Sequence, residues 1–289
     1  MPSLKQTIKN IQTLKIQGAN AVAENTLKSL LDFGKKIKAK KPSDFLTQIK
    51  KAGNDLAFAR PTEPMAQNLV EIVKTKLKVM AKQGAEVKQL KEILDYIVNH
   101  ELRELEEDHK QLTETGAKVI DNNDTILTFC HSSSVEKILI AAKKQKKKFK
   151  VIVPETRPLF QGRITARKLS KAKINVTMIV DSKTDQLLHK KEVDKVLIGA
   201  DVILKDGSII NKVGSFGICE DAFQHRIPVY VAAVTLKRTK GKVPIKIEKR
   251  HSLEIWKKAP KNITIENPAF DKVPKKFITG IITERGIIK

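Results

Sequence analysis

From about residue 116 onward, short apolar runs alternate with segments of helical periodicity, and few folds accommodate that order. The apolar runs span 125–129, 150–153, 176–180, 195–198 and 229–233. Helical segments lie between most of them, at 135–144, 162–171 and 217–225. This alternation is typical of a parallel sheet covered by helices on both faces. Because ligands of such sheets bind beyond the carboxyl ends of the strands, the sequence predicts a site there.

The residues before this point have helical periodicity, with apolar side chains recurring every three or four positions. Helices are expected at 45–57, 65–83 and 87–113, and the first of them would be capped by Ser43 or Asp44. The turn before the second contains two prolines, which a helix interior does not accept. The sequence therefore predicts an α/β protein: an N-terminal helical domain, 1–115, followed by a Rossmann-like parallel-sheet domain, 116–289, that carries most of the site.

The cysteine, histidine and glycine patterns exclude several classes of protein. Cys130 and Cys219 are the only cysteines, which excludes a disulfide framework or a cysteine-rich zinc site. The six histidines lack metal-ligand spacing and no glycine-rich nucleotide loop is present, so we expect no metal and no cofactor. No apolar run approaches the ~20 residues of a membrane span, and no signal-peptide pattern follows Met1. We therefore expect a cytoplasmic protein that does not contact membranes.

The formal net charge of +24 favours an anionic partner such as a nucleic acid, a nucleotide or a phosphorylated metabolite. The lysines are spread along the whole chain, however, and the densest run, 143–150, follows a helix whose C-terminus favours cations in any case. Aromatic residues make up only 4% of the chain, too few for an evident base-stacking surface. A solvated lysine-rich surface is the favoured interpretation, with RNA binding through 143–150 as the weaker one.

A thiol and three serines stand where the first strand of the second domain ends. Cys130 closes the apolar run, and Ser132, Ser133 and Ser134 precede a helix. Ser133 and Glu136 fit a capping box for that helix. A helix N-terminus can hold a phosphate and can lower the pKa of a nearby thiol, so this loop offers an anion site and an acid/base group. The alternative is that Cys130 is a small buried hydrophobic residue.

Further polar residues follow the other strands. Arg157 comes after the run 150–153, and its guanidinium could hold a phosphate through two parallel hydrogen bonds. Asp201 follows the run 195–198, and the remaining candidates are Asn211, Lys212 and Lys237. Each has an alternative role as a turn cap, a surface turn or a solvated lysine. A thiol, a carboxylate, an amide and cations at one edge of a sheet together favour a ligand site.

These motifs together resemble one family along nearly the whole chain. They are Ile16-Gln17-Gly18-Ala19, Ala59-Arg60-Pro61-Thr62, Thr128-Phe129-Cys130-His131-Ser132, Glu155-Thr156-Arg157-Pro158, Gln161-Gly162-Arg163-Ile164-Thr165-Ala166, Gly199-Ala200-Asp201, Asn211-Lys212-Val213-Gly214 and Ile281-Ile282-Thr283-Glu284-Arg285-Gly286. The family contains the alpha, beta and delta subunits of initiation factor two B, their archaeal relatives, methylthioribose-1-phosphate isomerase and ribose-1,5-bisphosphate isomerase. The Arg60 turn and the C-terminal motif look most similar to the last of these.

The resemblance implies an aldose–ketose isomerase that converts ribose 1,5-bisphosphate to ribulose 1,5-bisphosphate in nucleotide salvage. Cys130, as a thiolate base, and Asp201, as a neutral acid, would form the catalytic pair. The resemblance also implies a set of substrate-lining residues: Gln17, Gly18, Ala19, Asn20, Arg60, Ser132, Ser133, Ser134, Asn211, Lys212 and Lys237. It further implies a homodimer or a multiple of dimers.

A second interpretation is an archaeal factor-type subunit that binds nucleotides or sugar phosphates without turnover and engages initiation factor two. The shared fold, the net charge of +24 and Gln17, which stands where the isomerases usually have arginine, favour it. Phe129 also departs from the pattern, since the family favours histidine there. The two departures are consistent either with a substrate that carries one phosphate or with an enzyme that has lost its activity. Losing one phosphate-binding cation costs about 1.5–3 kcal/mol of binding. The first interpretation predicts turnover that a Cys130→Ser change abolishes, and the second predicts binding alone.

Overall fold

The computed structural model describes residues 2–239 and 247–289, which form two compact units. The first unit comprises Met1–Glu107 with Leu236–Arg238, and the second comprises Asp108–Thr235 with Thr239–Lys289. The division expected from the sequence, after residue 115, falls inside a long helix that begins in the first unit and ends in the second. Within the described residues, no helix is both long and apolar enough to cross a membrane.

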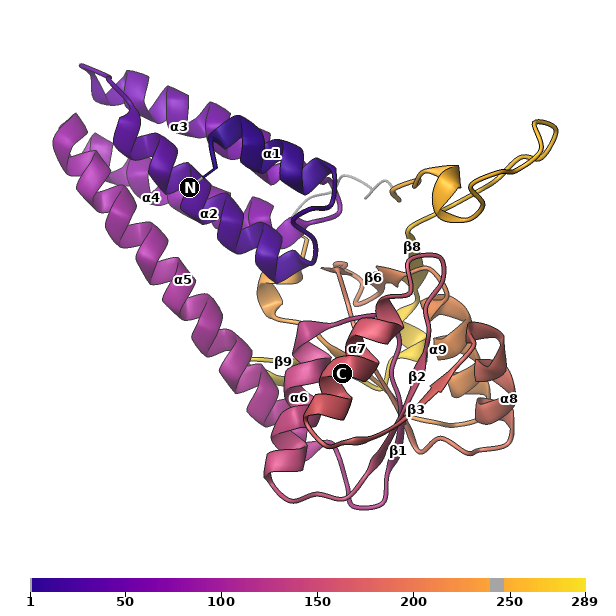
Figure 1. Ribbon diagram of the computed structural model, residues 1–289. Helices are drawn as coiled ribbons and strands as arrows, with labels where there is room; N and C mark the ends of the chain where they lie inside the picture. Colours follow the sequence, from indigo (N-terminus) through magenta and orange to yellow (C-terminus); the bar gives the residue numbers. More distant parts are fainter. Residues whose placement is uncertain (1, 240–246) are drawn as a thin grey trace. The chain divides into compact units, whose positions relative to one another are not determined.

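The first unit is built from helices (Figure 1). They are α1 (Leu4–Gln12), α2 (Ala19–Lys36), α3 (Pro42–Ala57), α4 (Pro64–Lys82) and the first part of α5 (Val87–Lys118). Their apolar faces meet in a core whose largest fully buried side chains include Phe45, Leu27 and Leu69. Proline begins both α3 and α4, where its missing N–H costs no helical hydrogen bond. The expected cap of α3 was wrong, because Pro42 already lies in the helix and the cap residue is Lys41.

A seven-stranded sheet with the order β10-β9-β7-β4-β1-β2-β3 forms the centre of the second unit. Its strands are β1 (Thr125–Leu127), β2 (Lys150–Pro154), β3 (Asn175–Ile179), β4 (Lys195–Gly199), β7 (Val229–Ala232), β9 (Gly280–Thr283) and β10 (Gly286–Ile288). All neighbours are parallel except β10, which runs antiparallel to β9. The expected Rossmann-like fold is confirmed, and the C-terminal segment docks as two strands of the sheet.

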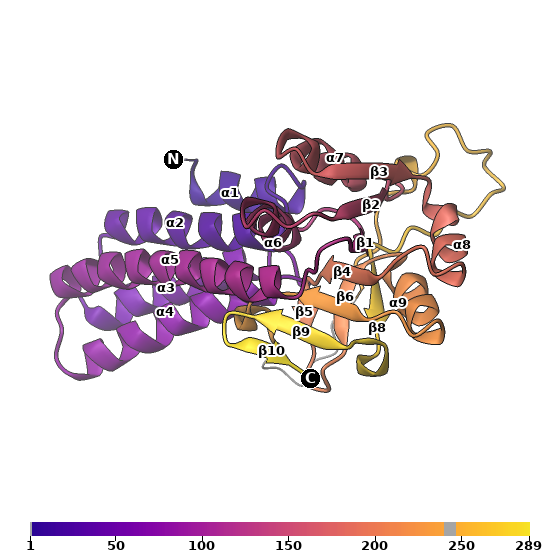
Figure 2. The ribbon, with the colours of Figure 1, turned by 90° about the horizontal axis from the view of Figure 1, so that it is seen from below.

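Helices cover both faces of this sheet (Figure 2). On one side lie α6 (Ser133–Lys144) and α7 (Gln161–Lys171), and on the other lie α8 (Thr184–His189) and α9 (Ser215–Gln224). Strands β1, β4 and β7 are almost entirely buried between these layers, which explains their continuous apolar sequences. Strand β3 is an edge strand and is largely exposed, so its apolar run does not mark a buried strand.

A second, three-stranded antiparallel sheet lies in the same unit. Its order is β5 (Val202–Ile203), β6 (Ile209–Lys212) and β8 (Phe270–Val273). Ile209 pairs with Val273, so the sheet joins segments that lie far apart in the sequence. Four short 3-10 turns complete the described elements: η1 (Asp181–Lys183), η2 (Thr235–Lys237), η3 (Ser252–Glu254) and η4 (Lys275–Phe277).

The strand order of the large sheet reverses its direction between β1 and β4. From β1 the chain proceeds outward through β2 and β3, and from β4 it proceeds in the opposite direction through β7 and β9. The neighbours β1 and β4 are parallel, with Leu127 opposite Val196. The connections after these two strands therefore diverge, which makes this the topological switch point of the sheet, where ligands of such folds bind.

Candidate active site

Cys130 and Asp201 follow the two strands that flank this switch point. Cys130 lies three residues beyond the end of β1, and Asp201 lies two residues beyond the end of β4. The two loops are in close contact, because a Cβ atom added at Gly199 would lie 2.6 Å from Ser132 Oγ. The Asp201 carboxyl acts electrostatically on the Cys130 thiol. The structure thus places the two residues near one another, and their role as an acid/base pair stays a prediction.

The ionised thiol that the sequence predicts is disfavoured in the free protein. Burial raises the pKa of Cys130 to about 11, and the charge of Lys212 and the backbone N–H of His131 lower it only in part. The negative charges of Asp201 and Asp181 add to the increase. Desolvation disfavours the thiolate more than the neighbouring cation and dipole favour it, so at neutral pH the thiol carries its proton.

The serine loop begins α6, although one residue earlier than the sequence predicts. Ser132, not Ser133, is the N-cap, and its side chain accepts a hydrogen bond from the Val135 N–H at 3.4 Å. Ser133 and Ser134 form the first turn, with Ser133 half-buried and Ser134 buried. The helix N-terminus and its serines therefore lie in the same loop as Cys130, as a phosphate site requires.

Strand β6 supplies Asn211 and Lys212 to the same unit. The Asn211 amide donates to Ser215 Oγ at 2.9 Å, and that hydroxyl donates to the Lys212 carbonyl at 2.6 Å. Lys212 is half-buried and close enough to Cys130 to affect its pKa. The turn after Lys212 needs glycine, because Gly214 has a φ of 101° and a Cβ there would lie 2.9 Å from the Phe129 ring. The Phe129 ring thus packs against the turn that follows Lys212.

Arg157 makes contacts of its own in the loop after β2. Its guanidinium lies 4.9 Å from the Phe160 ring centre and donates to the Ile255 carbonyl at 3.4 Å. Arg163 also lies over Phe160, at 3.9 Å, and pairs with Glu155 at 2.9 Å. Arg157 is exposed among these groups, and its use as a phosphate clamp stays a prediction.

The remaining candidates belong to the first unit. Gln17, Gly18, Ala19 and Asn20 form the start of α2, where Gly18 is the N-cap with a φ of 84°. Arg60 is buried and pairs with the buried Glu63 at 2.9 Å. Lys237 is buried in η2. The carbonyls of its two neighbours in the sequence, Leu236 and Arg238, accept hydrogen bonds from the Asn68 amide at 2.7 and 3.0 Å. The predicted substrate residues thus fall into two groups, one in each unit.

Sequence reasoning missed several supporting residues in the second unit. Thr156 and Thr165 bond the backbone of Cys130, and Asp181 bonds the loop that carries Thr156. Asp271 accepts from the N–H groups of Gly214 and Phe216, at 2.7 and 3.1 Å. Thr156 and Thr165 lie within motifs that the sequence singles out, but nothing in the sequence indicates their partners.

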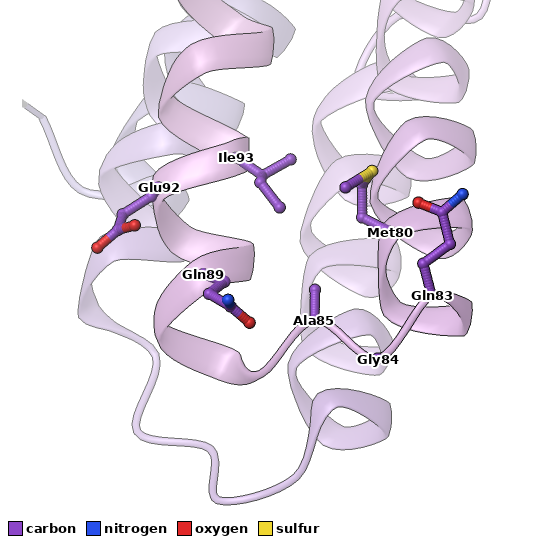
Figure 3. Close-up of a pocket in the computed structure, with 7 residues that line it drawn as sticks. All are labelled: Met80, Gln83, Gly84, Ala85, Gln89, Glu92 and Ile93. Carbon is purple, nitrogen blue, oxygen red and sulfur yellow. The ribbon is translucent and has the colours of Figure 1, made fainter.

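Two hollows in the described part of the surface lie away from these residues. One of about 420 Å³ surrounds the turn between α4 and α5, where Met80, Ala85 and Ile93 face one another and Glu92 points away (Figure 3). Another, of about 320 Å³, lies beside Phe223 and Phe277 near the amino end of β7. Neither of these two hollows contains a residue with the predicted chemistry. Among residues 2–239 and 247–289, no group of three or more His, Cys, Asp or Glu side chains is arranged to hold a metal ion.

The fold defines a Rossmann-like α/β protein with a cysteine and an aspartate at the switch point of its sheet. The chain belongs to the Initiation factor 2 subunit family, which matches residues 15–289. It is 36% identical to the ribose 1,5-bisphosphate isomerase of Thermococcus kodakarensis, over 96% of this chain and 88% of that protein. The isomerase of the same name from Methanocaldococcus jannaschii is also 36% identical, over 100% of this chain and 92% of that protein. A crystal structure of Pyrococcus horikoshii translation initiation factor eIF-2B matches with a TM-score of 0.85 and 28% identity, over 100% of this chain and 98% of that one.

Proposed function

We propose that this protein is an aldose–ketose isomerase that converts ribose 1,5-bisphosphate to ribulose 1,5-bisphosphate. The observation that carries the proposal is the pairing of Cys130 with Asp201 at the carboxyl ends of β1 and β4. The reaction moves protons between neighbouring atoms of the sugar and requires one base and one acid. The names of relatives that match nearly full length support the same substrate.

The reaction can be written with two protein groups. A base removes the proton from C2, the electron pair forms a C1–C2 double bond, and the bond between C1 and the ring oxygen breaks. An acid protonates the ring oxygen as it leaves. The enol then loses its hydroxyl proton to the conjugate base of that acid, and C1 receives the proton first taken from C2. Every atom is conserved, and both protein groups return to their starting states.

In our proposal Cys130 is the base and Asp201 is the acid. Since burial raises the pKa of Cys130 to about 11, the free protein holds a neutral thiol, and turnover requires that it lose this proton. Lys212 is the cation that favours the thiolate, which gives this lysine a function beyond binding phosphate. The serine-rich start of α6 and the side chain of Lys212 would hold a phosphate in the second unit. The predicted roles of Gln17 to Asn20, Arg60 and Lys237, which belong to the first unit, stay predictions.

The experiment that tests this function measures the conversion of ribose 1,5-bisphosphate by purified protein, with methylthioribose 1-phosphate as a second substrate. We expect turnover of the bisphosphate and its loss in Cys130→Ser and Asp201→Asn proteins. Cys219→Ala is the matched control, because that thiol is buried in the core on α9. An active Cys130→Ser protein would contradict the assignment of the base.

A factor-type subunit that binds without turnover is the second candidate, and two observations favour it. One is the likeness to the Pyrococcus horikoshii structure titled translation initiation factor eIF-2B. The other is Gln17, a neutral residue at the position where the isomerases usually have a charged arginine. In that case the purified protein would bind sugar phosphates or nucleotides calorimetrically with no product formed. It would also retain initiation factor two in a pull-down that Cys130→Ser leaves unchanged.

A further inference from the structure

Cys130 has a backbone conformation that a cysteine rarely adopts. Its φ is 65°, in the left-handed region where a Cβ atom crowds the following carbonyl oxygen. Residues held in such conformations persist only where surrounding structure fixes them, and they are concentrated at functional sites. The groups that fix Cys130 therefore determine where its thiol points.

Two threonine hydroxyls hold the peptide groups on either side of this residue. The Cys130 N–H donates to Thr156 Oγ1 at 3.0 Å, and the Cys130 carbonyl accepts from Thr165 Oγ1 at 2.8 Å. Thr156 comes from the loop after β2, and Thr165 comes from α7. Both threonines are buried, at 0% and 2% exposure, so water cannot replace either hydroxyl without opening the loop.

Thr156 is itself fixed by a carboxylate behind it. Asp181 Oδ1 accepts from the Thr156 N–H and Oδ2 accepts from the Arg157 N–H, each at 2.7 Å. Thr156 has a φ of 61°, and its hydroxyl donates to the Pro154 carbonyl at 3.2 Å while it accepts from Cys130. The hydroxyl therefore has both a fixed donor and a fixed acceptor. Asp181, Thr156 and Cys130 form a continuous chain of hydrogen bonds across the carboxyl ends of three strands.

We propose that Thr156, fixed by Asp181, is a positioning residue that holds the Cys130 thiol in its reactive orientation at the carboxyl end of β1. The proposal deepens the isomerase function and rests on it for its kinetic consequences. Its structural consequence, the orientation and protection of the thiol, is independent of any substrate. Loss of the hydroxyl would leave the Cys130 N–H unpaired and would let the loop relax to a negative φ.

The variants separate the hydroxyl from the shape of the side chain. Thr156→Val keeps the shape and removes the hydroxyl, whereas Thr156→Ser keeps the hydroxyl. Asp181→Asn is a second test in case Thr156→Val is unstable. Thr279→Val is the matched control, because the Thr279 hydroxyl also accepts a backbone N–H, that of Val229 at 2.9 Å, but at the amino end of the sheet. Thermal melts establish that each variant is folded.

Two readouts are used, and only the first requires turnover. We expect Thr156→Val to lower kcat about 100-fold with little change in KM, since a misplaced group impairs chemistry more than binding. We expect Thr156→Ser and Thr279→Val to retain kcat. In the second readout, iodoacetamide modifies the protein over a pH range and peptide mass spectrometry follows Cys130 separately from Cys219. Cys130 should react faster in Thr156→Val than in wild type, because a relaxed loop exposes the thiol. Asp181→Asn is judged by kcat alone, because removal of its charge also lowers the pKa of Cys130.

Wild-type rates in both readouts for Thr156→Val would overturn the proposal, as would an equal loss in Thr156→Ser. If the wild-type protein turns over no sugar phosphate, the proposed function fails and alkylation alone decides. Faster alkylation of Cys130 in Thr156→Val, but not in Thr156→Ser or Thr279→Val, would then still support the positioning role, and equal rates would overturn it.

Discussion

The Cys130 thiol is subject to two opposing influences, and their balance predicts a pH dependence. Burial raises its pKa from 9.0 to about 11, against the charge of Lys212. Below that pKa the thiolate fraction grows tenfold per pH unit, so a reaction that uses the thiolate accelerates as pH rises. We expect the rate of Cys130 alkylation by iodoacetamide to increase with a slope near one on a logarithmic plot between pH 7 and 10. A plateau that begins near pH 7 would contradict a thiol with this pKa.

Lys212 provides the charge that favours the thiolate, so its removal should raise the pKa of Cys130 further. We expect Lys212→Met to slow the alkylation of Cys130 at a fixed pH and to lower kcat/KM. Lys205→Met is the control, since Lys205 is an exposed lysine on the turn between β5 and β6. Equal alkylation rates in the two variants would contradict the electrostatic role of Lys212.

The start of α7 packs against the loop that carries Thr156, and a glycine makes the approach possible. A Cβ atom added at Gly162 would lie 1.9 Å from the Pro154 carbonyl oxygen, which a backbone atom cannot avoid by rotating. We expect Gly162→Ala to lower the free energy of unfolding by about 1–3 kcal/mol or more, the usual cost of overpacking. Activity should also fall, because the loop must move.

Gly217 offers the matched comparison for this prediction. It lies in the first turn of α9, and an added Cβ would meet nothing within 4 Å. We expect Gly217→Ala to be neutral or to stabilise by up to about 1 kcal/mol, through the higher helix propensity of alanine. Urea denaturation of both variants measures the difference, and equal stabilities would refute the packing argument.

The local pattern of the chain predicts most of the helices and the central strands, but not how the loops meet. The run that ends at Cys130 and the run before Asp201 mark β1 and β4, because strands buried on both faces must be apolar throughout. The bond from Cys130 to Thr156 joins residues 26 positions apart, and only the folded sheet brings them together. The local sequence does not predict the small sheet either, because its strands are short and β6 pairs with β8, which lies far away in the sequence.

The pKa of Cys130 is the clearest case in which sequence reasoning gave the wrong direction. The sequence places a helix N-terminus after the thiol, which lowers a thiol pKa. The depth at which the thiol lies is not encoded in the local pattern, and burial outweighs the dipole here. The helix also starts at Ser133, three residues beyond Cys130, where the dipole is already weaker.

Exposed apolar side chains of the second unit predict that copies of the chain associate with one another. Phe223, Ile287 and Ile288 are exposed on α9 and on the outer strand β10, at 52%, 43% and 42%. Outer strands with apolar side chains are commonly covered in assemblies. We expect light scattering after gel filtration to give twice the 32.4 kDa of one chain, or a multiple of it. A single-chain mass at micromolar concentration would contradict the proposed dimer.

A general role in RNA binding predicts a different behaviour for the whole protein. Binding through the run 143–150 would weaken steeply as salt increases, because each phosphate contact releases counterions. We expect only weak retention of single-stranded RNA, abolished by moderate salt, and no effect of RNA on isomerase turnover. Tight binding that persists at physiological salt would require a dedicated RNA surface that the even spread of lysines does not indicate.

Cys130 and Asp201, at the ends of β1 and β4, are proposed to isomerise a bisphosphorylated ribose. The most direct test incubates purified wild-type, Cys130→Ser and Asp201→Asn proteins with ribose 1,5-bisphosphate and follows ribulose 1,5-bisphosphate by coupled carboxylation. We expect turnover by the wild type and at least a 100-fold loss in each variant, the usual contribution of a general acid or base. A folded wild-type protein that binds the bisphosphate without converting it would contradict the claim and would favour the factor-type subunit.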